Sequence, residues 1–468
     1  MAPNRRDFLK IGGLAGMATL TGQVSATVVP KQPQQALSTT EQKFNMSGYA
    51  APALDKVRIA VIGLGNRGPG AVERLSKIEG VELNALCDLR QERVAHAQGR
   101  IRETEHQPES YSGDGDIWKK VCERDDIDLI YIATPWHLHT PMALYAMQQG
   151  KHAAVEVPAA ITLEECWQLV ETSESTKKHC MMLENTCYDF FELLTLNMAR
   201  QGFFGEIIHG EGAYIHELLE SNFSNGRYWD MWRLKQNRRN GSLYPTHGLG
   251  PIAQLMNVNR GDLMEYLVSV SSADFMMADK ARELAEEDDF YSRFADGSYR
   301  GNMNNTTIRT KKGRTILIQH DVTSPRPYSR LHIVSGTKAY AQKYPEPGKI
   351  SLGHEGFLSE SEMKKLEEQF QPPIVQRIGE LAKQIGGHGG MDFLMDWRLI
   401  DCLRNGIPLD QDVYDAAAWS AVGPLSEQSV ANRSASVDIP DFTRGAWQKN
   451  TPVDIELSKG GTTAILTA

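Results

Sequence analysis

Val57-Arg-Ile-Ala-Val-Ile-Gly-Leu-Gly-Asn-Arg-Gly68 is the stretch that decides the fold. Its first six residues are mostly apolar and rich in β-branched side chains, which predicts a buried strand. The strand leads directly into Gly63-x-Gly65-x-x-Gly68. In a dinucleotide-binding fold the first glycine makes a tight turn, the second lets the backbone approach a pyrophosphate, and the third lets the next helix pack on the strand.

A second feature supports a dinucleotide site. The glycines alone are weak evidence, because such clusters also mark ordinary surface turns. Residues 81–87 form another β-like run that leads to Asp88, about twenty residues after the last glycine, where an acid can bind a ribose diol. We therefore expect the glycines and Asp88 to bind NAD, because a carboxylate would repel the 2′-phosphate of NADP. Arg67 and Arg90 lie close in sequence and keep NADP open as an alternative.

Composition limits the class of protein. The chain has 468 residues, of which 41% are hydrophobic, and a formal net charge of −9. These values predict a soluble globular protein large enough for two domains. No basic run, aromatic RNA-binding box or zinc-ligand spacing occurs, which argues against nucleic acid as a partner and against a metal site. The six cysteines include no C-x-x-C pair, so we expect buried thiols rather than a disulfide framework.

Residues 1–26 resemble a twin-arginine export signal. Asn4-Arg-Arg-Asp-Phe-Leu-Lys10 precedes a weakly apolar stretch that is too short to span a bilayer, and Val24-Ser-Ala26 fits a cleavage site. We expect recognition by the Tat export machinery, a periplasmic or other extracytoplasmic location, and no stable membrane insertion after signal removal. A basic N-terminal helix is the alternative. Residues 27–54 contain several prolines and no sustained apolar period, which predicts a linker or a strap over the surface.

Strands and helices alternate over residues 55–185. Residues 128–133 form an apolar run that predicts a buried strand, and Trp136 and His139 follow on the loop where open α/β sheets bind ligands. Thr140-Pro141 predicts the start of the next helix, which would place His139 at a helix start rather than in the core. The alternation predicts an α/β Rossmann domain with a parallel, doubly wound sheet.

The pattern changes in the second half of the chain. Four runs predict strands, and Lys311-Lys-Gly313 predicts a hairpin turn between the second and the third, as Gly336-Thr337 does inside the fourth. We expect an α+β domain with an open, mainly antiparallel sheet over residues 186–435, followed by a C-terminal extension at 436–468. The four runs are residues 209–218, 306–310, 315–322 and 331–341.

The first of these strands carries glycines next to a tyrosine. Gly210, Gly212, Tyr214 and His216 lie on one face of the strand, because side chains alternate between the two faces. Since glycine has no side chain, we expect room for a ligand beside the Tyr214 ring.

Two stretches resemble the glucose–fructose oxidoreductase/inositol dehydrogenase family. They are Thr134-Pro-Trp-His-Leu-His139 and Gly150-Lys-His-Ala-Ala-Val-Glu-Val-Pro158, and the resemblance extends over residues 55–435. It implies a Rossmann domain paired with an open-sheet domain, and commonly a homodimer. Many dehydrogenases of this family have Glu-Lys-Pro where this chain has Glu156-Val157-Pro158. A valine cannot ionise, which argues against net dehydrogenation.

Further stretches are similar to the NAD-dependent glycoside hydrolases of family 109, typified by exo-acting α-N-acetylgalactosaminidases. They are Glu184-Asn-Thr-Cys-Tyr188, Leu243-Tyr-Pro-Thr-His-Gly248 and Gly387-His-Gly-Gly-Met-Asp392. The resemblance is weak at residues 218–232 and 274–305, so the exact sugar stays open. The resemblance implies that NAD is lined by Asn66, Arg67, Asp88, Trp136, His139, Glu156, Val157 and Asn185, and the sugar by Tyr214, Arg233, Tyr244, His247 and Tyr328.

The implied reaction is redox-neutral hydrolysis with retention. The sugar is oxidised transiently at C3, its C1 substituent is eliminated, water adds, and C3 is reduced again. No carboxylate pair is required, but a base, an oxyanion donor and NAD are. We expect His247 and Tyr244 to form the acid/base pair, with Tyr188 as a supporting donor, because imidazole titrates near neutrality and a phenol can donate to an oxyanion. A hydrogen-bonded turn histidine, a surface salt bridge for Arg233 and plain packing for Tyr328 are the alternatives.

Three functions compete at this point. The first is the redox-neutral glycosidase that acts on a glycoside substrate. The second is a periplasmic sugar or inositol dehydrogenase, against which Val157 argues. The third is a non-catalytic sugar-binding protein that keeps a structural NAD, against which the tyrosines and histidines argue. His388 is either part of the site or only a backbone neighbour of it.

Overall fold

The computed structural model describes residues 41–466. The expected export signal and the first part of the expected linker lie outside these residues. Residues 41–54 form no helix or strand, yet they are tied to the rest of the protein. The Met46 side chain is buried and its N–H donates to the Tyr414 hydroxyl at 3.2 Å, and the Leu54 N–H donates to the Leu403 carbonyl at 3.1 Å. This part of the chain is therefore a strap.

The first sheet has six parallel strands in the order β3-β2-β1-β4-β5-β6. Every residue of β4 and β5 is buried, as expected for a sheet with helices on both faces. The strand order reverses between β1 and β4, which is where such sheets bind ligands. The strands are β1 (Val57–Ile62), β2 (Val81–Cys87), β3 (Glu109–Tyr111), β4 (Leu129–Ile132), β5 (His152–Val155) and β6 (Cys180–Met182).

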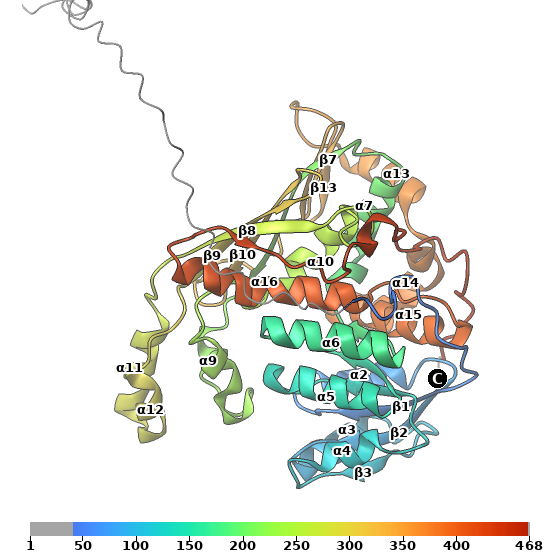
Figure 1. Cartoon of the computed structure of the whole chain (residues 1–468), viewed down its shortest axis with the longest axis vertical. Helices are drawn as coiled ribbons and strands as arrows, with labels where there is room; N and C mark the ends of the chain where they lie inside the picture. Colours follow the sequence, from blue (N-terminus) through green and yellow to red (C-terminus); the bar gives the residue numbers. More distant parts are fainter. Residues whose placement is uncertain (1–40, 467–468) are drawn as a thin grey trace, which may run out of the picture. The chain divides into compact units, whose positions relative to one another are not determined.

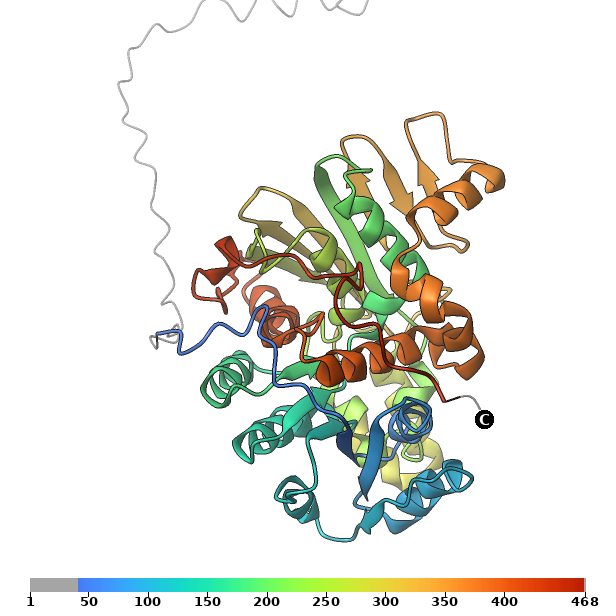
Figure 2. The ribbon, with the colours of Figure 1, turned by 90° about the vertical axis from the view of Figure 1, so that its right-hand side faces the viewer.

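Helices cover both faces of this sheet, which confirms the predicted doubly wound Rossmann domain (Figures 1 and 2). On one face lie α2 (Gly68–Leu75) and α3 (Gln91–Arg100). Two long helices from the end of the chain complete the layers, because α15 packs on α2 and α16 packs on α6. The helices of the other face are α4 (Ile117–Cys122), α5 (Trp136–Gln148) and α6 (Leu163–Thr176). The two helices from the end of the chain are α15 (Met391–Asn405) and α16 (Val413–Ala431).

The second sheet has eight strands in the order β13-β12-β11-β7-β10-β9-β8-β14. The α+β class is confirmed, but the sheet is mixed, because β7 and β10 pair in parallel while the other pairs are antiparallel. The run at 331–341 forms two antiparallel strands joined by a turn after Gly336, which confirms the hairpin predicted there, whereas β8 was missed. The strands are β7 (Ile207–Ile215), β8 (Met264–Ser271), β9 (Met303–Thr310), β10 (Thr315–Asp321), β11 (Ile333–Gly336), β12 (Tyr340–Gln342), β13 (Lys349–Ser351) and β14 (Val437–Asp438).

Two glycines of β7 bring helix α10 (Thr246–Leu255) onto the sheet. A Cβ on Gly212 would lie 2.2 Å from the Gly248 carbonyl oxygen, and one on Gly210 would lie 2.5 Å from the Ile252 side chain. The expectation that these glycines leave room for a ligand is therefore wrong, because α10 fills that space. The close approach fixes the start of α10, which carries His247, beside the end of β7, which carries Tyr214.

The remaining helices complete the second half and its connection to the first. The C-terminal extension returns to the Rossmann domain, where the Leu466 N–H donates to the Lys77 carbonyl at 2.7 Å. These helices are α7 (Phe190–Arg200), α8 (Leu219–Asn222), α9 (Trp232–Gln236), α11 (Met277–Glu287), α12 (Ser292–Ala295), α13 (Glu360–Phe370) and α14 (Pro373–Ile385), with short 3₁₀ turns η1 (Asn185–Tyr188), η2 (Trp229–Met231), η3 (Asp289–Tyr291), η4 (His388–Gly390) and η5 (Ala446–Gln448).

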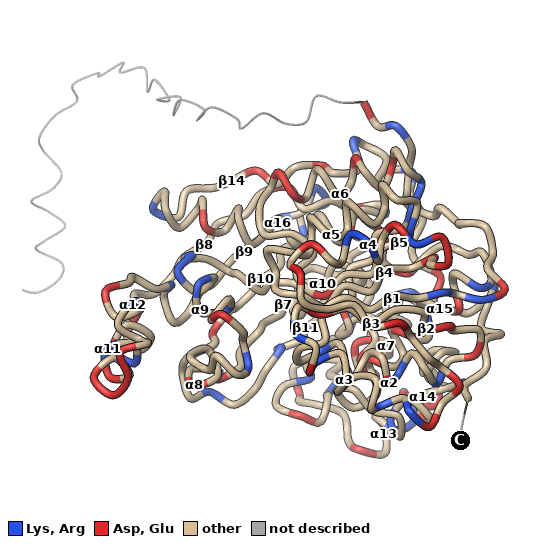
Figure 3. The backbone as a smooth tube through the Cα atoms, turned by 90° about the horizontal axis from the view of Figure 1, so that it is seen from below, with Lys and Arg blue, Asp and Glu red and all other residues tan. Residues whose placement is uncertain are grey.

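Charges and cysteines follow the pattern expected from the sequence. Acidic and basic residues are interspersed along the described chain (Figure 3). All six cysteines are buried free thiols, as predicted. Within residues 41–466, no helix is long and apolar enough to cross a bilayer. The same residues contain no cluster of three or more histidine, cysteine or acidic side chains that could hold a metal ion.

Candidate active site and cofactor cleft

The glycine loop has the geometry that a dinucleotide requires. Gly63 has a φ of +92°, and a Cβ there would lie 2.6 Å from the Ala133 carbonyl group. A Cβ on Gly68 would lie 2.0 Å from the Gly63 carbonyl oxygen, so this glycine lets α2 pack on the loop. Gly65 differs from both, because a Cβ there would meet no atom within 4 Å. Its backbone faces open space in which a pyrophosphate fits, next to the N-terminus of α2.

Asp88 is held beside this loop by the backbone. Its Oδ2 accepts from the Leu64 N–H at 2.7 Å, and its Oδ1 accepts from the Arg90 N–H at 2.9 Å. Each carboxylate oxygen keeps a second lone pair, so the side chain fits the predicted ribose contact. The Arg90 guanidinium lies 4.6 Å over the Trp229 ring. The Arg90 guanidinium therefore faces an aromatic ring that belongs to the second half of the chain.

A buried network of charges continues from the loop. Arg67 Nε donates to Glu156 Oε1 at 2.7 Å, and its Nη1 donates to Asp392 Oδ2 at 3.1 Å. Burial opposes ionisation of Asp392, but the charges of Arg67 and Arg74 and the hydrogen bond of His388 together outweigh it and hold the pKa of that carboxyl well below its ordinary value. The His388 ring is part of this network, since its Nδ1 lies 2.9 Å from Asp392 Oδ2. The Asn185 amide donates to Asp392 Oδ1 at 2.6 Å.

Asn185 also offers an unused acceptor. Its Oδ1 is buried and has no hydrogen-bond partner among the described residues. An orphaned buried carbonyl is unfavourable unless a ligand or water satisfies it, so this atom fits a donor such as the amide of a nicotinamide. Asn66, on the glycine loop, donates from Nδ2 to the Arg227 carbonyl at 2.8 Å. Residues 226–229 thus touch the cofactor side of the Rossmann domain.

His139 differs from its prediction, because α5 begins at Trp136 rather than after Thr140. The histidine lies inside the helix, is 1% exposed, and its two ring nitrogens lie 2.7 Å from the Pro158 and Thr134 carbonyl oxygens. Burial lowers its pKa. It is therefore a core residue that joins two strand ends. Pro141 lies inside the helix, where its missing N–H removes one backbone hydrogen bond.

Five predicted residues meet in a cluster of rings around Tyr244. The Tyr244 ring is stacked on Trp136 at a centroid distance of 5.4 Å, and it lies 4.6 Å from Tyr214 and 4.8 Å from His247. Arg233 lies over the same ring at 5.3 Å. Burial raises the pKa of Tyr244 well above its ordinary value and that of Tyr214 to about 12, so both phenols are neutral donors at physiological pH.

His247 is held by a residue that the sequence analysis did not select. Its Nδ1 lies 2.6 Å from Oε1 of Glu184, a side chain with 0% exposure that also accepts from the Thr186 N–H and hydroxyl. Burial opposes ionisation of Glu184, but the charge and hydrogen bond of His247 outweigh it and lower the carboxyl pKa. A carboxylate at Nδ1 fixes the tautomer, so Nε2 is available as a base. This hydrogen bond fits a catalytic base and equally the hydrogen-bonded turn histidine of the alternative.

Arg233 has no acidic partner. Its guanidinium lies 5.1–5.3 Å from the ring centroids of Trp136, Tyr228 and Tyr244, and the residue is 8% exposed. Within residues 41–466, no carboxylate comes within salt-bridge distance of it. Burial opposes its charge, but the surrounding phenols outweigh this effect and raise its pKa. It is therefore a buried cation, free to face a ligand, and not the surface salt bridge of the alternative.

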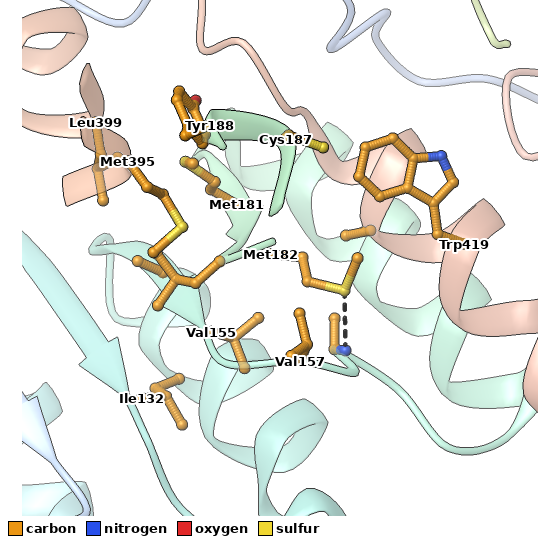
Figure 4. Packing of buried hydrophobic residues seen from close by; sticks show 14 of the residues in the cluster. Ile132, Val155, Val157, Met181, Met182, Cys187, Tyr188, Met395, Leu399 and Trp419 are labelled. Atoms are coloured by element: carbon orange, nitrogen blue, oxygen red, sulfur yellow. Dashed lines mark hydrogen bonds between the residues drawn. The ribbon is translucent and has the colours of Figure 1, made fainter. Parts of the chain in front are cut away.

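Tyr188 is not brought to the ring cluster. Its hydroxyl donates to Asp410 Oδ2 at 3.3 Å, and its side chain is 3% exposed. Figure 4 shows the ring beside Met181 and near Met395, in the packed interior. The predicted role as a supporting donor therefore has no geometric basis. Val157 is also buried in this packing, at 3% exposure (Figure 4).

Each half of the chain matches the model of a known protein family. A model described as "Oxidoreductase family, NAD-binding Rossmann fold" matches residues 57–184, and one described as "Glycosyl hydrolase 109, C-terminal domain" matches residues 188–449. A glycosyl hydrolase family 109 protein 1 of Bacteroides fragilis is 48% identical over 460 residues, which cover 93% of this chain and 96% of that protein. An alpha-N-acetylgalactosaminidase of the same species is 51% identical over 417 residues, covering 88% and 97%.

A solved structure shares the fold. Levoglucosan dehydrogenase in complex with NADH and levoglucosan aligns with a TM-score of 0.62 at 16% sequence identity, over 82% of this chain and 100% of that chain. At this identity the likeness concerns the fold alone, since one fold hosts many chemistries.

Proposed function

Because the chain belongs to glycoside hydrolase family 109 and its N-terminal domain binds NAD, we propose that it is an exo-acting α-N-acetylgalactosaminidase or a glycosidase of a closely related sugar. We propose further that it works by transient oxidation of the sugar at C3 and retains the anomeric configuration. The observation that carries this proposal is the contact of His247 with buried Glu184 on one side and Tyr244 on the other.

The chain's own residues supply proton transfer and charge stabilisation. When bound, NAD supplies the reversible two-electron acceptor that converts the C3 alcohol to a ketone and back. The ketone acidifies the proton at C2, and His247, oriented by Glu184, is the base that takes it. The C1–O bond then breaks and the departing alcohol takes up a proton. Water adds at C1 and the proton returns to C2, so atoms and electrons balance over the cycle.

The negative charge on the C3 oxygen during elimination needs donors that are already in place. Tyr244 is a neutral buried phenol, and Arg233 is a buried cation without a carboxylate of its own. Preorganised donors of this kind account for a large part of many rate enhancements. Arg233 also suits the N-acetyl carbonyl of the substrate. Val157 stands where related dehydrogenases carry a lysine and cannot ionise, which supports elimination over net oxidation.

The test is hydrolysis of p-nitrophenyl α-N-acetylgalactosaminide by the purified protein without added NAD. We expect nitrophenol release with no accumulation of NADH, and an isotope effect or solvent exchange with a C2-deuterated substrate. Stoichiometric NADH with an intact aglycone would identify a sugar dehydrogenase instead, and no turnover of any glycoside would identify a binding protein. His247→Ala should suppress turnover while NAD stays bound.

We also propose export of the folded, NAD-loaded protein through the Tat pathway. The proposal rests on Asn4-Arg-Arg-Asp-Phe-Leu-Lys10 alone. Changing Arg5 and Arg6 together to lysine should leave the protein in the cytoplasm, as measured by cell fractionation. Unchanged export of the double variant would contradict it.

A further inference from the structure

A cavity of about 890 Å³ lies beside the ring cluster. This volume is near the upper end of the range of about 300–1,000 Å³ that ligand pockets have, and it exceeds the needs of a single sugar ring. The start of α7, the chain around β11 and β12, and the helical segment α13–α14–η4 supply its walls. None of Tyr214, Arg233, Tyr244 and His247 lines it. It is therefore a space distinct from the ring cluster.

Aromatic side chains form much of the wall. The rings of Tyr328 and Tyr344 lie 5.9 Å apart at an interplanar angle of 73°. Phe191 lines the same space, and the backbone of Gly348 lies against it, because a Cβ there would be 2.4 Å from the ring. Ring faces of this kind pack well against the C–H-bearing faces of a sugar ring.

The charged groups of the wall balance one another. Arg330 Nη2 lies 2.6 Å from Asp189 Oδ2 and 2.9 Å from Glu192 Oε1, and Lys343 Nζ lies 2.5 Å from Asp189 Oδ1. The charged side chains that line the cavity are Arg330, Lys343 and Lys383 on one side of the balance and Asp189, Glu346 and Glu367 on the other, so cations and carboxyl groups are equal in number. Arg330 keeps donor capacity, since its Nη1 makes only a long bond of 3.4 Å to the Tyr328 hydroxyl. Polar groups without excess charge suit hydroxyl groups better than an anionic ligand.

Tyr328 is the wall that the cavity shares with the ring cluster. Its ring lies 5.0 Å from that of His216, whose Nδ1 lies 3.1 Å from the Tyr214 hydroxyl. Its other neighbour, Tyr344, belongs to the cavity. Tyr328 is 41% exposed, so it is not closed off by packing on all sides. Tyr328 therefore lines the cavity on one side and, through His216, contacts the ring cluster on the other.

We propose, on the basis of the function proposed above, that this cavity binds the saccharide to which the terminal sugar is attached. The ligand is a neutral oligosaccharide that stacks on Tyr328, Tyr344 and Phe191 and directs hydroxyl groups to Arg330 and its neighbours. The protein therefore selects its substrates by the aglycone as well as by the sugar that it removes.

Gln371→Trp tests the proposal by filling the cavity from the end of α13. Gln371 is exposed, directly follows α13 and lines the cavity. Gln369→Trp is the matched control, because Gln369 is exposed in the last turn of α13 and does not line the cavity. The substrates are the aryl glycoside and a trisaccharide with the same terminal sugar, used with the NAD-loaded full-length protein.

We expect Gln371→Trp to lower kcat/KM for the trisaccharide by about tenfold or more, mainly through KM, while changing that for the aryl glycoside by less than about twofold. Gln369→Trp should change neither value. Equal cleavage of the trisaccharide by both variants, or an equal loss on both substrates, would overturn the proposal. A selective loss on a glycopeptide instead of the trisaccharide would also overturn it, because a peptide aglycone would then be the ligand.

Direct binding separates this inference from the proposed function. The saccharide that lacks the terminal sugar is titrated calorimetrically into the native protein and into both variants. We expect binding by the native protein and by Gln369→Trp, and at least about tenfold weaker binding by Gln371→Trp. This result together with no cleavage of any glycoside would mean that the cavity assignment holds while the glycosidase assignment fails. If the native enzyme cleaves glycosides but does not bind the saccharide, the glycosidase assignment holds while the cavity assignment fails.

Discussion

Replacing Glu184 with glutamine should slow the reaction while leaving substrate binding nearly unchanged. The side chain is fully buried and contacts His247 Nδ1 at 2.6 Å, so it acts on the base and does not touch the sugar. Glutamine can still accept the hydrogen bond, but it cannot stabilise the imidazolium that forms when His247 takes a proton. A bond to a charged partner is worth about 1–2 kcal/mol more than a neutral one, which corresponds to roughly a 5- to 30-fold fall in kcat.

The assay is aryl glycoside hydrolysis at saturating substrate, with bound NAD measured by absorbance after denaturation. Glu174→Gln is the matched control, because Glu174 is also buried and bonded, to the Tyr414 hydroxyl at 2.9 Å, in another part of the protein. It should lose stability without losing kcat. An unchanged kcat in folded, NAD-loaded Glu184→Gln, or an equal fall in both variants, would refute the role assigned to Glu184.

The same substitution has a consequence for pH dependence. The pKa of Glu184 lies below its ordinary value of 4.5 in the folded state, so its ionised form stabilises the fold above about pH 4.5. That contribution is lost as the pH falls through the lowered pKa. Chemical denaturation at pH 7 and at pH 4 should therefore show a larger drop for the native protein than for Glu184→Gln. Equal drops would contradict the pKa assignment.

Three further changes separate the parts of the site. Gly65→Ala should fold normally but weaken NAD binding by about tenfold or more, because a Cβ there meets open space where the pyrophosphate fits. Gly68→Ala should lower the melting temperature, because a Cβ there would lie 2.0 Å from backbone. Equal melting temperatures of the two variants would contradict this geometry. Tyr244→Phe should lower kcat by about 10–100-fold without altering the alkaline limb of the pH profile, since burial keeps the phenol protonated; an alkaline limb that only the native enzyme shows would argue against a neutral donor. Arg233→Met should reduce kcat/KM by about 100-fold or more in the aryl glycoside assay and should not weaken NAD binding; a loss of NAD would place this cation at the cofactor instead.

Local signals in the sequence were sufficient for the Rossmann half. The apolar run at 57–62, the three glycines and Asp88 each act on neighbours within a few residues, and the structure places them as predicted. The helix start at Trp136 was missed because Thr140-Pro141 also matches a helix start. The helix begins only a few residues after β4 ends at Ile132, before the chain reaches Thr140. His139 is consequently inside the core.

Long-range partners could not be predicted in the same way. Nothing near Glu184 in the sequence reveals that it contacts His247, which lies 63 positions later. The only signal available was its place at the end of β6, directly before Asn185, at the edge of the sheet where ligands bind. Gly210 and Gly212 predicted an empty space beside β7, because glycine has no side chain, but the sequence did not reveal that α10 fills that space. The parallel pairing of β7 with β10 depends on the whole topology of the sheet.

The isolation of Arg233 from every described carboxylate affects how this protein can be improved in the laboratory. A buried cation without a counter-charge is unfavourable for folding, so a new aspartate or glutamate near it would raise the melting temperature. Selection for heat resistance alone is therefore expected to enrich such substitutions and to yield robust but inactive variants, a trade-off known from other proteins. Libraries for industrial use should exclude acidic residues from this neighbourhood and seek stabilising changes elsewhere.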